Sequence, residues 1–136
     1  MKKGIILIIF FVFYSVLSFS QDRDRNYILA LSVELYMNTS SRVECDNFLT
    51  EFKDMLTINA TWQTDSIAMF NSFVQKAKYA KHYRKMDVRC QFVYEPDDNH
   101  NTTVCTDGFD ILINGRLIKR NKKFISFLKS IAYGHP

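Results

Sequence analysis

Glycine, proline and cysteine are scarce in this chain, whose 136 residues include four Gly, two Pro and three Cys. Four glycines cannot supply both a Gly-rich dinucleotide-binding loop and the ordinary turns, and they exclude a collagen-like chain. Three cysteines are too few for a mini-protein held mainly by disulfides. The motifs Gly-x-Ser-x-Gly, His-Glu-x-x-His and Cys-x-x-Cys are absent. We therefore expect a protein without cofactor or metal that is not an enzyme.

The first 20 residues have the pattern of a secretory signal peptide. Two early lysines precede an unbroken apolar run over 5–13, and Ser18 and Ser20 are small residues suited to positions −3 and −1 of a cleavage site. A membrane anchor is the alternative, but the apolar run is shorter than the about 20 residues that a spanning helix needs. The sequence predicts export to the periplasm or the medium, with no transmembrane span after cleavage.

The remaining residues, 21–136, suit one domain of ordinary size. The chain is 47% apolar and 15% aromatic, which is enough to bury a core. Apolar periodicity and turn residues predict this order: strand 27–37, helix 41–56, an extended stretch 57–63, helix 66–84, strands 87–95, 102–106, 109–113 and 116–119, and a helix after residue 121. This order predicts a two-layer α+β fold, an antiparallel β-meander with helices packed on one face.

Capping and turn signals set several of these boundaries. Ser41 and Glu44 fit a capping box, and Thr64 or Asp65 can cap the next helix. Asn114-Gly115 is typical of a tight hairpin turn. Asn121 can cap the last helix, and a glycine at 134 can end it.

The sequence favours a disulfide between Cys90 and Cys105. If Glu95 lies opposite His100 in the hairpin, Cys90 lies opposite Cys105 on the same face. The alternative is that both are small buried apolar residues. Cys45 is then the odd cysteine, which can be a buried thiol, an intermolecular bridge or a reactive site.

Charge is distributed unevenly along the chain. Residues 21–65 carry eight acids and four bases, whereas residues 66–136 carry twelve bases and six acids. The candidate residues for binding an anion or a partner form two basic groups: Lys76, Lys78, Lys81, Arg84 and Lys85, and then Arg116, Lys119, Arg120, Lys122 and Lys123. Tyrosines interleave with the first group, as in many nucleic-acid-binding proteins. Because the predicted compartment argues against nucleic acid, we expect an acidic protein, a polysaccharide or an anionic membrane surface instead.

Two resemblances to known families follow from short motifs. The helix followed by an antiparallel meander is similar to a cystatin-type domain, and Gln91-x-Val93 matches part of the Gln-x-Val-x-Gly motif, with Glu95 in place of its glycine. The segments Asp87–Arg89, Cys105–Phe109 and Ile113–Gly115 resemble the C-terminal half of small exported proteins of unknown function in Bacteroidetes. The second resemblance implies an α+β fold and export, and no activity.

Three functions remain for a protein with these features. The first is a non-catalytic binding module of the envelope or the medium. The second is an inhibitor or immunity-type protein directed against a secreted hydrolase. The third is a Cys-dependent enzyme that uses Cys45.

Overall fold

The computed structural model describes residues 25–82 and 84–134. The predicted signal peptide, 1–20, lies outside the described residues. The elements follow in the order β1 (Ile28–Ser32), η1 (Cys45–Asn47), α2 (Phe48–Glu51), β2 (Thr57–Thr61), α3 (Thr64–Gln75), β3 (Cys90–Asp97), β4 (His100–Thr106), β5 (Ile111–Ile113), β6 (Arg116–Leu117) and α4 (Lys122–Tyr133).

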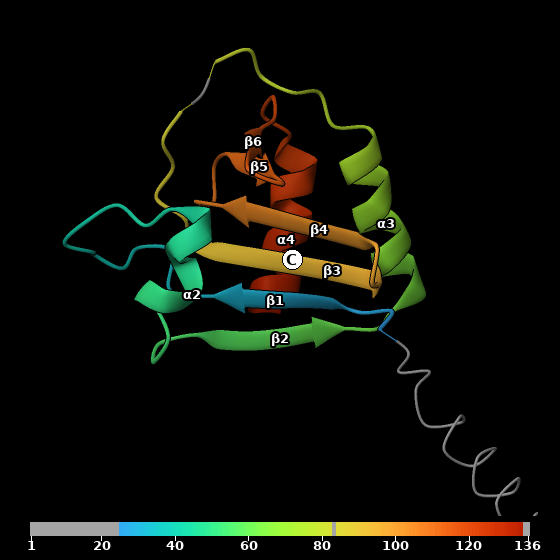
Figure 1. Cartoon of the computed structure of the whole chain (residues 1–136), viewed down its shortest axis with the longest axis horizontal. Helices are drawn as coiled ribbons and strands as arrows, with labels where there is room; N and C mark the ends of the chain where they lie inside the picture. The colour runs from blue at the N-terminus through green and yellow to red at the C-terminus, as the bar shows by residue number, and fades with distance from the viewer. Residues whose placement is uncertain (1–24, 83, 135–136) are drawn as a thin grey trace, which may run out of the picture.

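All six strands form one antiparallel sheet in the order β2-β1-β3-β4-β5-β6. The consecutive strands β3 to β6 make the predicted meander, and β1 pairs with β3 at its other side (Figure 1). The predicted α+β class is therefore confirmed.

The sheet carries a hydrophobic cluster on each face. The larger one joins α3 and α4 to the sheet around Phe70, Phe92 and Phe124. The smaller one joins η1 and α2 to the other face, where Phe48 and Phe52 are buried. The two long helices share one face as predicted, while α2 adds a partial layer over the other face (Figure 1). For this reason both faces of β1 are buried, rather than the single face that its alternation predicts.

The register of the β3–β4 hairpin differs from the predicted one by one residue. Asp97, not Glu95, lies opposite His100, and Gln91, not Cys90, lies opposite Cys105. The Asp97 carboxylate closes a tighter turn, because its Oδ1 accepts from the backbone N–H groups of residues 99 and 100, each at 2.9 Å. A bulge between Tyr94 and Asp97 absorbs the irregularity.

Two predicted helices are shorter than their periodicity indicates. The capping box at Ser41 does not form, because Val43 is held extended: its carbonyl accepts from Val88 N at 2.9 Å, and its N–H donates to Asp87. Helix α3 begins at Thr64 without a side-chain cap and ends at Gln75 instead of continuing to residue 84. The last helix is correct at both ends, with Asn121 accepting from the N–H of residue 124 and Gly134 in the left-handed region at φ 68°.

Candidate functional site: a basic surface at one edge of the sheet

The two basic segments, distant in sequence, lie side by side in the fold. After α3 the chain runs along β6, where Ala80 N donates to Leu117 O at 2.9 Å and Lys119 N donates to Lys78 O at 2.7 Å. Tyr79 and Ile118 form an isolated antiparallel bridge at the same place. Residues 76 and 77 make the last hydrogen bonds to α3, and residues 78–80 then pair with 117–119 rather than continuing the helix.

We call the resulting surface the basic edge. It consists of the ten predicted cations, all exposed: Lys76, Lys78, Lys81, Arg84, Lys85, Arg116, Lys119, Arg120, Lys122 and Lys123. Neither 76–85 nor 116–123 contains an acidic residue. The structure therefore brings together the residues that the charge pattern indicates, on the segment after α3, on β6 and the residues that follow it, and on the first turn of α4.

A single carboxylate accounts for the ion pairs made by the basic edge within the described ranges 25–82 and 84–134. Asp110 pairs with Arg84 at 2.9 Å and with Arg120 at 3.4 Å. Asp110 was missed at the sequence level, although it is the one charged residue in the apolar stretch 109–113 and that signal could have indicated a partner for the cations. No ion pair within those ranges involves the other eight cations.

An aromatic ring lies within the basic edge. The Arg116 guanidinium carbon lies 3.9 Å from the ring centroid of Tyr79, which is a cation–π distance. This contact holds the planar guanidinium against the ring and leaves its N–H groups available for an anionic group.

The start of α4 adds positive potential to the basic edge. Lys122 and Lys123 occupy the first turn, which has no acidic residue. Helix dipoles favour acids there, so two lysines oppose the stability of the helix. Such a conflict between local stability and charge placement is expected where the charge serves binding.

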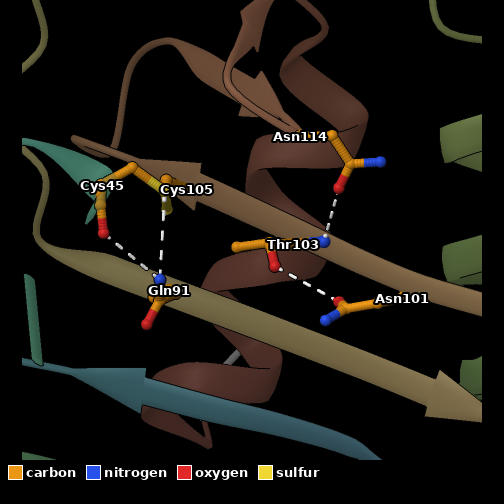
Figure 2. The surroundings of a disulfide bond; sticks show 6 residues. All are labelled: Cys45, Gln91, Asn101, Thr103, Cys105 and Asn114. Carbon is orange, nitrogen blue, oxygen red and sulfur yellow. Dashed lines mark hydrogen bonds between the residues drawn. A yellow bond between two sulfur atoms is a disulfide. The ribbon is translucent and has the colours of Figure 1, made fainter. Parts of the chain in front are cut away.

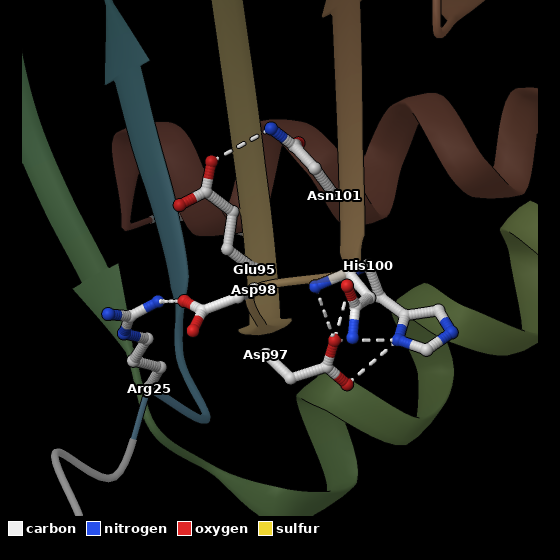
Figure 3. Close-up of polar contacts among 7 residues, drawn as sticks. Arg25, Glu95, Asp97, Asp98, His100 and Asn101 are labelled. Carbon is white, nitrogen blue, oxygen red and sulfur yellow. Dashed lines mark hydrogen bonds and ion pairs between the residues drawn. The ribbon is translucent and has the colours of Figure 1, made fainter.

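The acidic side chains of the turn between β3 and β4 make hydrogen bonds and ion pairs within the protein (Figure 3). His100 Nδ1 lies 2.7 Å from Asp97 Oδ1, and this hydrogen bond is the main reason why the pKa of Asp97 is lowered. Asp98 pairs with Arg25. No group of three metal-ligating side chains occurs in the described residues.

The predicted disulfide is wrong in its pairing. Cys45, expected to be the odd cysteine, is bonded to Cys105 (Figure 2), and Cys90 is a buried free cysteine. The one-residue register difference is the cause, because it turns Cys90 and Cys105 to opposite faces of the sheet. A cysteine in a disulfide has no thiolate, so Cys45 is not available as a nucleophile in this state.

Cys90 lies in an apolar site on the α4 side. Burial raises its pKa to about 11, although the nearby Tyr133 hydroxyl, 3.2 Å from the sulfur, acts in the opposite direction. A raised pKa keeps the thiol neutral and unreactive.

No known family, curated protein or solved structure matches this chain. The two resemblances therefore stay hypotheses. Among the described residues no helix is long and apolar enough to cross a membrane.

Proposed function

We propose that this protein is an exported, non-catalytic binding module that binds an acidic protein through the basic edge. The observation that carries the proposal is the convergence of two acid-free segments, with ten exposed cations and one carboxylate between them. Clustered charge of one sign attracts and orients a partner of opposite charge.

The stacked pair Arg116–Tyr79 favours a protein over a polysaccharide or a membrane as the partner. Arginine and tyrosine are enriched among the residues that contribute most to binding at protein interfaces. Tyr79 is 39% exposed, so part of its ring is free for contact.

Export is part of the proposal and is supported by two observations. The sequence pattern of residues 1–20 is that of a signal peptide. The Cys45–Cys105 disulfide is typical of oxidising compartments.

The test is affinity capture with the oxidised protein from the envelope and culture fluid of the source cells. We expect an acidic protein, released by raising the salt from about 50 to about 500 mM, because salt screens exposed charges. The variant Lys78→Gln/Lys119→Gln removes two neighbouring cations and should weaken the purified complex about tenfold or more. The control Arg42→Gln/Lys53→Gln removes two exposed cations elsewhere and should leave the affinity nearly unchanged.

Other outcomes contradict the proposal. Equal losses in both variants would mean that net charge alone drives binding. Capture of no acidic protein, together with salt-sensitive binding to dextran sulfate or to vesicles containing anionic lipid, would mean that the partner is not a protein. If the captured protein is a hydrolase, its activity in the complex separates inhibition from simple binding.

A further inference from the structure

A polar groove lies on the sheet face opposite α3 and α4. It has a volume of about 460 Å³, within the range of small-ligand sites, and lies beside the Cys45–Cys105 disulfide. Its polar lining comes from η1, the two central strands and the β5–β6 turn: Asp46, Gln91, Asn101, Thr103 and Asn114. Figure 2 shows four of these side chains over β3, β4 and the turn. No residue of the basic edge lines the groove.

Several polar atoms in the groove are without a hydrogen-bond partner among the described residues. Gln91 is 8% exposed; its Nε2 donates to Cys45 O at 3.3 Å, and its buried Oε1 has no partner. Asn114 uses its Oδ1 to accept from Thr103 N at 2.8 Å. Neither the Asn114 amide nitrogen nor the Asp46 carboxylate makes a hydrogen bond to another described residue. Buried polar atoms in native proteins are nearly always paired, so Gln91 Oε1 is an exception in the floor of the groove, whereas Asn114 and Asp46 are exposed and open to a ligand.

The groove continues into a row of side chains across the open part of the same face. Asn101 Nδ2 donates to Glu95 Oε1 at 2.8 Å, and Figure 3 shows the two side chains meeting on one side of the hairpin. Next along the row are Tyr27 and Trp62, whose ring centroids are 5.5 Å apart. Leu29 pairs with Ala60 on one side and with Val93 on the other. Tyr27, Trp62 and Glu95 each lie two residues away from one of these three. Because side chains alternate along a strand, they face the same side of the sheet.

We propose that this groove and row bind an uncharged oligosaccharide. Sugar hydroxyls donate and accept hydrogen bonds, which matches a lining of amides, a hydroxyl and carboxylates. The apolar face of a sugar ring can stack on an exposed aromatic ring, and Trp62 is 64% exposed.

The same lining disfavours other ligands. An anion would meet the carboxylate of Asp46 and no cation. A metal ion would need more ligands than this one carboxylate supplies, and no group of three occurs in the described residues. An apolar ligand would leave the amides unpaired.

The single tryptophan of the chain makes the test direct. The purified oxidised protein is titrated with cellotetraose, maltotetraose, xylotetraose, mannotetraose and chitotetraose, and its fluorescence and calorimetric heat are recorded. We expect saturable binding of at least one oligosaccharide with a change in the Trp62 emission. Because the ligand is uncharged, the affinity should be nearly the same at about 50 and about 500 mM salt.

Two variants locate the binding surface. Trp62→Ala removes the stacking ring and Asn101→Ala removes a groove amide, and each should weaken the calorimetric affinity about tenfold or more. Met69→Ala, an exposed apolar residue on α3, and Lys78→Gln/Lys119→Gln in the basic edge are the controls and should bind as the unmodified protein does. Thermal unfolding of each variant confirms that it is folded.

Two results would overturn the proposal. One is the absence of saturable binding to every oligosaccharide in the set. The other is a folded Trp62→Ala or Asn101→Ala protein that binds as tightly as the unmodified one. Neither result bears on the acidic partner, because that interaction uses a different surface and is lost at high salt.

Discussion

At the scale of single residues, burial decides what each ionisable group can do. Arg89 follows the first basic group closely in sequence, but its side chain is 7% exposed and pairs with Asp87 at 2.5 Å. Its guanidinium also donates to the carbonyl of Met37 at 3.1 Å and lies over the ring of Phe52. Arg89 therefore fixes the segment after β1, whereas the exposed cations of the basic edge are free for a partner.

The buried Cys90 gives a prediction about thiol reactivity. At pH 8 the native protein should not react with a thiol reagent, because burial raises the pKa of Cys90 to about 11. After unfolding without reductant, one thiol per chain should react, and mass spectrometry should place the label on Cys90. Three reactive thiols in the unfolded chain would contradict the Cys45–Cys105 bond.

The same pKa predicts how stability depends on pH. The unfolded thiol loses its proton near its ordinary pKa of 9.0, while the folded thiol keeps it until about pH 11. Stability from the neutral thiol is therefore present below pH 9 and is lost as the pH rises through this window. Urea unfolding of the protein and of a Cys90→Ala variant, compared at both ends of the window, isolates this contribution.

At the scale of elements, some local signals predicted the structure and others did not. The Asn114-Gly115 turn formed as expected, with φ of 47° and 76° at the two residues. The β3–β4 register was wrong because the carboxylate of Asp97 closes the turn two residues beyond the predicted point. Long-range pairing also overrode periodicity, since residues 78–80 pair with residues 117–119 instead of extending α3.

The first turn of α4 gives a prediction that links stability to binding. The variant Lys122→Glu/Lys123→Glu places two acids at the positive end of the helix dipole, so the free energy of unfolding should rise by up to about 1 kcal/mol. The same change should weaken binding of the acidic partner. Urea unfolding and a binding titration measure the two effects.

Ser126→Glu provides the control for that variant. It adds an exposed acid beyond the first turn of the helix, where the dipole has little effect, and it lies outside the basic edge. Lower stability of the double variant, or an unchanged affinity for the partner, would contradict the role assigned to these lysines.

At the scale of the whole molecule, the candidate surfaces are assembled from segments distant in sequence. All ten cations could be identified from the sequence, but their convergence depends on the pairing of Lys78 with Lys119, which no local pattern encodes. The groove was not predicted, because the wrong register placed Gln91 and Cys105 on opposite faces. The actual disulfide fastens the short η1–α2 layer to the sheet beside that groove.

This disulfide gives a prediction about the stability of the whole fold. It joins residues separated by 60 positions. In the chain-entropy account, closing a loop of that length is worth about 4 kcal/mol, more than the shorter loop between Cys90 and Cys105 would give. Because the free energy of unfolding of small domains is about 5–15 kcal/mol in total, reduction should shift the urea midpoint strongly.

The Cys45→Ala/Cys105→Ala variant should be similarly destabilised and should not respond further to reductant. If reduction destabilises Cys90→Ala as much as the unmodified protein, the observed pairing accounts for the effect; if Cys90→Ala is insensitive to reductant, Cys90 takes part in the bond and the pairing is wrong.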